Sequence, residues 1–334
     1  MLRNNYRYLN GNYLVKYDYY SRSLIKRGLR FNEPFLPDFP DSIDLKITNK
    51  CEWGCPWCHE SSNKNGKSFS LKRTKKILSE LPEIPIEIAI GGGNVLDIPE
   101  ETLELVKWLM SRNNQPRITI NYKDIKKHWN ETNGPCFDLV REIQNMGISL
   151  DSAPVGVNQY DSFSAEYKES KYWSPTFASN TIGNGGGYSV FHIIAGLFPP
   201  NDIITLRKNF RNYPILILGF KQWGRAKNSE LPIKKLKETE KIVEDIISNP
   251  RYETSGFNVL GFDNLALEQL HIKEKLPKEI WNRLYFGDEG THSMYVDAVN
   301  EKFAVTSRSA DRVSWNDIGL IDYFKKISHD RCNN

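Results

Sequence analysis

From Ser42 onward, short apolar runs alternate with segments of helical periodicity, and this alternation limits the possible folds more than any other feature. Six strand–helix repeats with apolar strands favour an α/β protein with a parallel sheet covered by helices. Periodicity alone leaves open whether that sheet is open or curled into part of a barrel. The predicted strands are 43–47, 84–90, 117–121, 148–151, 190–197 and 214–220, and the predicted helices between them are 71–81, 99–111, 138–146 and 201–209.

The segments on either side of this core have a different pattern. Asn10-Gly11-Asn12 stands between two short apolar-rich runs, which predicts a hairpin, and three prolines then indicate an extended linker. After Lys227 the pattern predicts a charged helix at 233–248, short strands at 257–261, 293–297 and 302–306, and a last helix at 316–328. We therefore expect an N-terminal hairpin and linker (1–41), a core (42–227) and an α+β C-terminal extension (228–334).

The composition sets few limits on function. The chain has 334 residues and a formal net charge of +4, from 45 basic and 41 acidic residues, which neither demands nor excludes a nucleic-acid partner. The longest apolar stretch, 190–198, is too short to span a bilayer, and the first residues lack the apolar run of a signal peptide. We therefore expect a cytoplasmic protein without a membrane partner.

Three of the five cysteines stand together directly after the first core strand, as Cys51-Glu-Trp-Gly-Cys55-Pro-Trp-Cys58. Three thiolates on one tight loop can face a single point, which is what iron–sulfur ligation needs. A structural zinc site normally closes with four ligands, and the candidate fourth, His59, is awkwardly placed beside Cys58. The spacing favours a three-ligand cluster with one open iron, and leaves a zinc site or an unrelated cysteine group as alternatives.

The pattern Cys-x-x-x-Cys-x-aromatic-Cys after a strand resembles the signature of the radical S-adenosylmethionine (SAM) superfamily. The resemblance implies that Cys51, Cys55 and Cys58 hold a [4Fe-4S] cluster, whose open iron is chelated by the amine and carboxylate of SAM. In that family an electron from the cluster cleaves SAM to methionine and a 5′-deoxyadenosyl radical, which abstracts hydrogen from a substrate. Trp57, the aromatic residue of the pattern, is implied to lie against the adenine.

The later strand ends carry further matches to the same superfamily. Gly92-Gly93-Asn94 stands where Gly-Gly-Glu commonly holds the methionine ammonium. Asn94 replaces the acid there, so the charge-assisted part of that hydrogen bond is lost. Asn121 and Ser149 stand at strand ends that resemble the family's ribose contacts. Ile194 and Gly196 match part of an adenine-contacting motif whose terminal acid is absent. The resemblance implies that these four residues are further cofactor-binding positions.

The resemblance covers roughly residues 42–227 and implies a partial (β/α)6 barrel with the cluster at its carboxyl-terminal mouth. The C-terminal hairpin around Tyr295 resembles that of peptide-modifying relatives, which slightly favours a peptide over a nucleoside as substrate. A flavodoxin or ferredoxin is implied as reductant. A narrower similarity to an uncharacterised phage and bacterial subgroup rests on Cys58-His-Glu60, Gly91-Gly-Gly-Asn94, and Gly287-Asp-Glu-Gly290 with Tyr295-Val-Asp297.

Two other functions remain open. One is a zinc-binding interaction protein with the three loop cysteines and His59 as ligands. The other is a member that binds SAM without turnover, because Asn94 and Pro199 replace acids of the family pattern.

Four further features have a structural and a functional interpretation each. His192 is either a packed core histidine or a substrate contact. Lys221 and Arg225 either bind an anion at the mouth or form surface ion pairs. Gly183–Gly187 is a flexible loop or a lid, and Cys136 is either an idle buried thiol or a radical relay.

Overall fold

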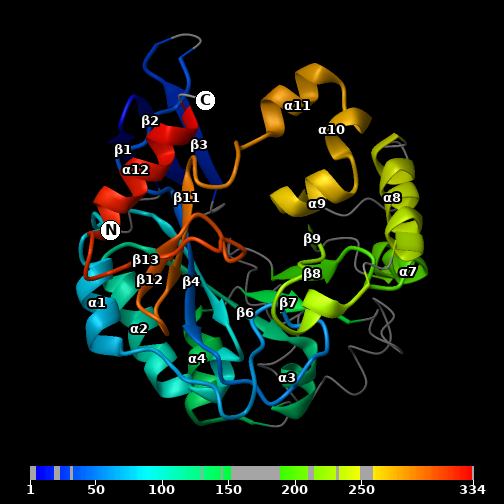
Figure 1. Cartoon of the computed structure of the whole chain (residues 1–334), viewed down its shortest axis with the longest axis horizontal. Coiled ribbons are helices and arrows are strands. Elements are labelled where there is room, and N and C mark those ends of the chain that lie inside the picture. Colours follow the sequence, from blue (N-terminus) through cyan, green and yellow to red (C-terminus); the bar gives the residue numbers. More distant parts are fainter. Residues whose placement is uncertain are drawn as a thin grey trace.

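The computed structural model describes residues 5–18, 23–30, 33–128, 131–143, 146–151, 189–209, 214–230, 233–248 and 259–332. Its centre is a mostly parallel sheet. The strands of this sheet are β4 (Ser42–Thr48), β5 (Glu87–Gly92), β6 (Gln115–Asn121), β7 (Gly147–Ser149), β8 (Val190–Ile194), β9 (Ile215–Leu218), β10 (Leu260–Phe262), β11 (Ser293–Asp297), β12 (Lys302–Ala304) and β13 (Val313–Ser314). Figure 1 shows them crossing the middle of the molecule.

The strand order of this sheet is β10-β9-β8-β7-β6-β5-β4-β11-β12-β13. From β4 to β10 every strand pairs in parallel with the next one along the chain. The predicted parallel α/β core is thus confirmed, and β10 extends it by one strand. On the other side of β4, β11 pairs in parallel with it, and β12 and β13 follow antiparallel.

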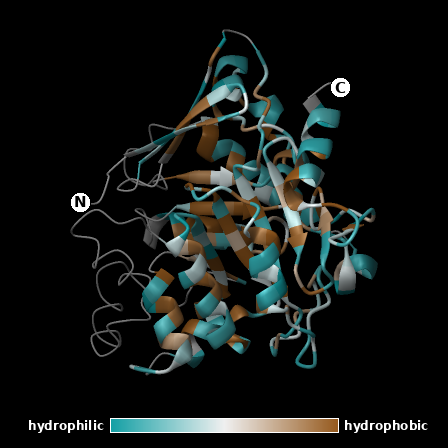
Figure 2. Cartoon of the chain, turned by 90° about the vertical axis from the view of Figure 1, so that its left-hand side faces the viewer, coloured by the Kyte–Doolittle hydropathy of each residue, from teal (hydrophilic) through white to brown (hydrophobic). Residues whose placement is uncertain are grey.

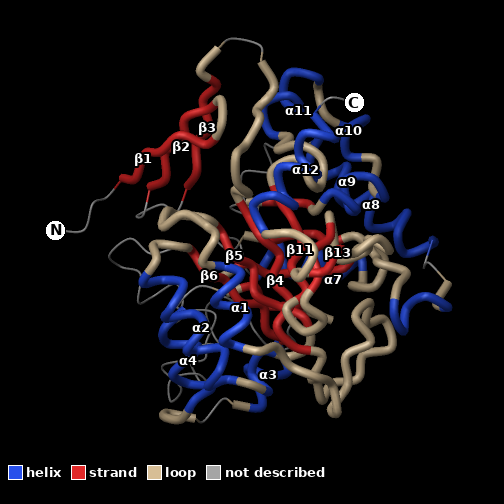
Figure 3. The backbone as a smooth tube through the Cα atoms, turned by 60° about the vertical axis from the view of Figure 1, so that its left-hand side comes forward, coloured by secondary structure: helices blue, strands red, loops and turns tan. Residues whose placement is uncertain are grey.

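Helices cover the sheet. In Figure 3 the helices α1, α2 and α4 lie together beside the sheet. The helices are α1 (Leu71–Leu78), η1 (Val95–Asp97), α2 (Pro99–Ser111), α3 (Tyr122–Lys127), α4 (Pro135–Ile143), α7 (Pro200–Asn209), η2 (Gly224–Asn228), α8 (Ile233–Ser248), α9 (Asn264–Gln269), α10 (Ile272–Lys275), α11 (Lys278–Leu284) and α12 (Leu320–Cys332). Among the described residues, no helix has the length and apolar character needed to cross a bilayer.

The alternation of side chains along β4 gives the sheet a core face and a polar face. Ile43, Leu45 and Ile47 are at most 1% exposed and belong to the main hydrophobic cluster. Burying such a side chain contributes about 1.5–3 kcal/mol relative to leaving it in water. Lys46 points to the opposite face, where it meets charged partners. The apolar colouring of Figure 2 accordingly concentrates in the strands, and the outer helix faces are hydrophilic.

A separate antiparallel sheet precedes the core, formed by β1 (Asn5–Asn10), β2 (Tyr13–Asp18) and β3 (Ser23–Gly28). The predicted hairpin at Asn10-Gly11-Asn12 is confirmed, and β3 is a third strand that the hairpin prediction did not include. This sheet stands apart from the central one (Figure 3). Tyr13 and Lys26 connect it to the start of β4, because both contact the carboxylate of Asp41, at 2.7 and 2.5 Å.

Candidate functional site

The cysteine loop follows β4 at the carboxyl end of the parallel strands. Its backbone is fixed locally, since Cys51 N–H donates to the Asn63 carbonyl at 2.9 Å and Cys58 N–H to the Cys55 carbonyl at 3.2 Å. All three thiols are free and partly exposed. Burial raises the pKa of the Cys51 and Cys55 thiols. A bound cation would therefore be needed to hold these two groups as thiolates.

The separation of the three loop sulfurs bears on the kind of metal site that they could form. In the described part of the chain, the group of three metal-binding side chains whose ligand atoms all lie within 4.8 Å of one another is His128, Glu131 and Cys136, not the loop cysteines. A tetrahedral zinc ion with Zn–S bonds of about 2.3 Å would bring its sulfurs to within about 4 Å of one another. The three loop sulfurs, by contrast, do not all lie within 4.8 Å of one another.

His59, the candidate fourth zinc ligand, lies among charged side chains. Its Nε2 lies 3.7 Å from Glu60 Oε1. Burial and the nearby positive charge of Lys221 lower the pKa of His59 to about 4, so the ring is neutral near pH 7. Its described neighbours are thus charged side chains on the polar face of the sheet.

Gly92 and Gly93 pack directly beneath the segment that leads into the loop. A side chain at Gly93 would place its Cβ 2.1 Å from the Lys50 carbonyl oxygen, and one at Gly92 would place it 2.4 Å from that of Thr48. Gly93 N–H donates to the Thr48 carbonyl at 2.6 Å. The two glycines therefore allow β5 to approach the loop closely.

Asn94 lies at the same strand end, 5% exposed, with its side chain already in use. Its Oδ1 accepts from Leu96 N–H at 3.1 Å and so caps η1, while its Nδ2 donates to Asp124 Oδ1 at 2.9 Å. The predicted contact to an ammonium would therefore have to share or replace these bonds.

The other predicted cofactor contacts follow the same edge of the sheet. Asn121 pairs with Ser149 in register, and Ser149 pairs with His192 on β8. Ile194 ends β8 and Gly196 follows it. The structure therefore places the strand-end residues of the prediction at the carboxyl ends of four neighbouring strands, β5 to β8, beside β4, which leads into the cysteine loop. Trp57 lies in the loop, partly buried.

His192 is packed in this region rather than free. A Cβ added to Gly147 would lie 2.4 Å from the His192 ring, so the ring fills the space that Gly147 leaves. Burial lowers the pKa of His192 to about 4. The structure thus supports a packed, neutral histidine. The glycine-rich segment Gly183–Gly187, considered as a lid, lies outside the described residues.

Arg225 holds the second half of the cysteine loop. Its Nε donates to the Cys55 carbonyl at 2.9 Å, its Nη1 to the Ser62 carbonyl at 2.6 Å, and its backbone N–H to the Cys58 carbonyl at 3.0 Å. Neither sequence interpretation of Arg225 described this role. Lys221, in contrast, donates to Ser307 Oγ at 3.3 Å.

The short helix α3 holds the first half of the loop. Trp53 Nε1 donates to Asp124 Oδ1 at 2.8 Å, and Lys123 Nζ lies 5.8 Å from the Trp53 ring centroid. Lys127 forms an ion pair with Glu52. Sequence reasoning missed this helix, although the pair Asn121 and Asp124 forms a capping box that marks a helix start.

A buried ion network lies on the polar side of β4, next to the loop. Lys46 Nζ lies 2.5 Å from Glu60 Oε2 and 3.6 Å from Asp297 Oδ2. Tyr295 donates to Glu60 Oε1 at 2.9 Å, and Arg312 to Asp297 Oδ2 at 2.6 Å. This network joins the loop to β11, so the C-terminal extension contributes to the surroundings of the site.

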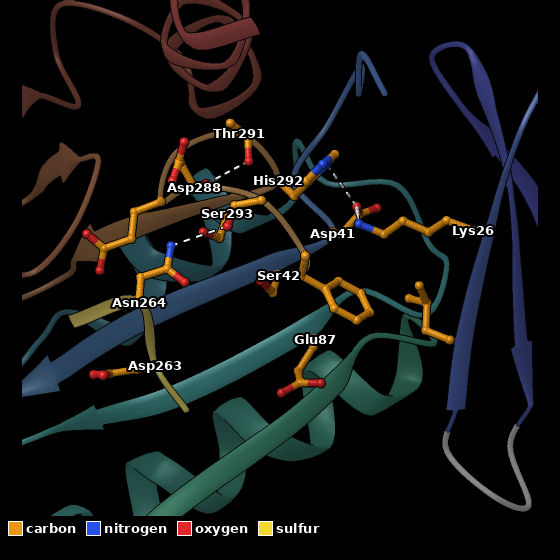
Figure 4. Close-up of a pocket in the computed structure, with 14 residues that line it drawn as sticks. Lys26, Asp41, Ser42, Glu87, Asp263, Asn264, Asp288, Thr291, His292 and Ser293 are labelled. Atoms are coloured by element: carbon orange, nitrogen blue, oxygen red, sulfur yellow. Dashed lines mark hydrogen bonds and ion pairs between the residues drawn. The ribbon is translucent and has the colours of Figure 1, made fainter. Parts of the chain in front are cut away.

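A cavity of about 450 Å³ opens at the opposite, amino-terminal ends of β4, β5 and β11. Figure 4 shows Ser42 and Glu87 on its floor, Lys26 beside Asp41 at one side, and Asp288 and Asn264 at the other. Asp263 and Glu289 also line it. The cavity is therefore rich in carboxylates and separate from the cysteine loop.

No family model matches the sequence, and no curated protein matches it. Several solved structures share its fold, among them the following three. SuiB from Streptococcus suis bound to S-adenosylmethionine has a TM-score of 0.58 at 11% identity, over 97% of this chain and 87% of SuiB. SuiB bound to the precursor peptide SuiA has a TM-score of 0.58 at 10% identity, over 96% and 87%. The third, anSMEcpe with bound AdoMet and Cp18Cys peptide, has a TM-score of 0.51 at 12% identity, over 87% and 82%.

At these identities the matches show a shared fold and no more. SuiB is bound to S-adenosylmethionine and anSMEcpe to AdoMet in these structures, and the present chain shares their mixed α/β fold. Its cysteine loop stands at the carboxyl edge of the parallel strands.

Proposed function

We propose that the chain is a radical SAM enzyme that binds a [4Fe-4S] cluster through Cys51, Cys55 and Cys58. The observation that carries this proposal is the arrangement of the three free thiols. They stand on one loop at the carboxyl end of sequentially ordered parallel strands, spread more widely than a mononuclear zinc ion requires. The unbroken parallel order from β4 to β9 also supports the partial (β/α)6 barrel expected for such an enzyme.

Different residues of the chain would bind the cluster and orient the cofactor at this site. The cluster and SAM, when bound, supply a one-electron reductant and a source of a carbon radical. Cys51, Cys55 and Cys58 ligate, and the strand-end positions orient the cofactor beside them. These positions are Gly92, Gly93, Asn94, Asn121, Ser149, Ile194 and Gly196, with Trp57 from the loop. An external reductant such as a flavodoxin or ferredoxin supplies the electron.

A peptide is the substrate class that we propose. The solved neighbours support it, since SuiB is bound to the precursor peptide SuiA in one structure and anSMEcpe to the Cp18Cys peptide in another. The substrate would approach the strand ends beside the loop, where a radical generated from the cofactor can reach it.

Anaerobic reconstitution tests the proposal. We expect about four irons per chain and formation of 5′-deoxyadenosine that depends on dithionite and SAM. C55A should lose both, whereas C136A should keep both, because Cys136 donates to the Leu96 carbonyl outside the loop. One zinc per chain with no iron uptake, or 5′-deoxyadenosine formation by C55A, would contradict the proposal.

A further inference from the structure

The Asp124 carboxylate lies where three parts of the chain meet, and it is 1% exposed. Its Oδ1 accepts from Trp53 Nε1 at 2.8 Å and from Asn94 Nδ2 at 2.9 Å, and its Oδ2 accepts from Asn121 N–H at 3.0 Å. All three partners are N–H donors. The position therefore requires a side chain whose two polar atoms only accept, as those of a carboxylate do.

Helix capping explains only part of this geometry. The Oδ2 bond to Asn121 belongs to the capping box of α3. Both Oδ1 bonds leave the helix, one to the cysteine loop and one to the end of β5. A carboxylate needed for the cap alone would not have to meet Trp53 and Asn94.

Trp53 connects the Asp124 carboxylate to the cysteine loop. It stands between Cys51 and Cys55, and α3 holds its indole on two sides, through Asp124 at the N–H and Lys123 over the ring. The Cys55–Cys58 half of the loop has a different holder, since Arg225 bonds the Cys55 and Cys58 carbonyls. The two halves are thus fixed by two separate parts of the chain.

We propose that Asp124 is a positioning residue for the Cys51–Cys55 half of the loop, acting through the Trp53 indole. The proposal rests on the proposed function insofar as the thiolates are taken to hold a cluster. The fixing of the loop itself is a property of the protein without any bound group.

D124N tests the contact with little change in shape. The amide replaces one acceptor atom by a donor, so at least one of the three N–H groups loses its partner. We expect reconstituted D124N to release iron to a chelator about tenfold faster than the unaltered protein. W53F should act similarly, and W53F/D124N should be no more than about twofold faster than either single variant, because both remove one contact.

D41N is the matched control at the other end of β4. Asp41 is also buried and accepts from Asn10, Tyr13 and Lys26, but it lies outside the site. D41N should lower the Tm and leave the rate of iron release unchanged. A general loss of stability would instead accelerate release in both variants.

A second measurement needs no cluster. In the metal-free protein, D124N should speed alkylation of Cys51 by iodoacetamide several-fold and leave Cys58 unchanged, because Arg225 still holds the Cys55–Cys58 half. Iron release within twofold of the unaltered protein, equal acceleration in D41N, or additive effects of W53F and D124N would overturn the role of Asp124. Failure of the unaltered protein to take up iron would overturn the proposed function, and the alkylation pattern would still decide the role of Asp124.

Discussion

The Nε–H of Arg225 donates to the carbonyl oxygen of Cys55 over 2.9 Å, so a residue that follows the sixth core strand holds the middle of the cysteine loop. The guanidinium also reaches the Ser62 carbonyl, and the backbone N–H reaches that of Cys58. The planar fork of arginine can serve two carbonyls at once, whereas a lysine ammonium on a flexible stem is not pre-organised to do so.

We therefore predict that R225K lowers the free energy of unfolding by about 1–3 kcal/mol, the cost of leaving a buried carbonyl without its donor. Urea unfolding of the metal-free protein measures it. R141K is the control, because Arg141 forms an exposed ion pair with Asp138, and it should change stability by less than about 0.5 kcal/mol. Equal effects of the two substitutions would contradict the prediction.

Gly224 precedes Arg225 and has a backbone φ of +56°, with its α-carbon against the loop. A Cβ there would stand 2.4 Å from the His59 carbonyl oxygen. We predict that G224A lowers the free energy of unfolding by about 2–5 kcal/mol, because alanine would adopt an unfavourable left-handed conformation and would also overlap the His59 carbonyl. Thermal unfolding checks the loss. G54A is the informative comparison, because Gly54 also has a φ of +57° but its Cβ would meet nothing within 4 Å. It should cost about 1–2 kcal/mol.

The ion pair between Lys46 and Glu60 is almost fully buried, with side chains 6% and 8% exposed. We predict that K46M destabilises the protein by about 3–5 kcal/mol, because it leaves a buried carboxylate without its cation. K46M/E60Q should recover part of the loss, since both charges are then removed. K75M, which breaks the more exposed pair with Glu104, should cost under about 1 kcal/mol. Urea unfolding at neutral pH compares the three variants, and a K46M effect no larger than that of K75M would count against the network.

The buried His192 ring should make the free energy of unfolding depend on pH. Burial lowers its pKa to about 4 in the folded protein, against about 6.5 in an unfolded chain. Between these values the unfolded chain binds a proton that the folded protein does not, so stability contributed by the neutral ring is present above pH 6.5 and falls with pH toward 4. We expect H192Q to lose stability more slowly than the unaltered protein over this range. Urea unfolding at pH 7, 6 and 5 measures the difference, and parallel curves would contradict it.

Much of the fold follows from local sequence patterns. The helices at 99–111 and 233–248 and the strand at 293–297 have the predicted ends, because their apolar spacing is long or regular enough to define a period. The pairing of β11 with β4 could not be predicted this way, because it depends on which distant strand completes the sheet. The short helices α3 and α9–α11 were missed, since four to seven residues give no reliable periodicity.

The same division applies to the site. Spacing alone selects the loop cysteines as candidate ligands, and the predicted strands place Asn121 and Ser149 at the same edge of the sheet. Asp124 and Arg225 could not be assigned in this way, because each acts on backbone or indole groups far away in sequence. The hydrogen bond from Asn94 to Asp124 could not be predicted either, because Asp124 lies on a helix that the sequence pattern did not reveal.

The pairing of β4 with β11 also affects how the chain folds during its synthesis on the ribosome. One edge of the first core strand pairs with residues 293–297, which follow it far along the chain. On the ribosome this edge would therefore stay bare for on the order of ten seconds or more, while the intervening chain is made. A bare strand edge can pair with other chains, so the nascent protein would benefit from chaperones until its final segment emerges.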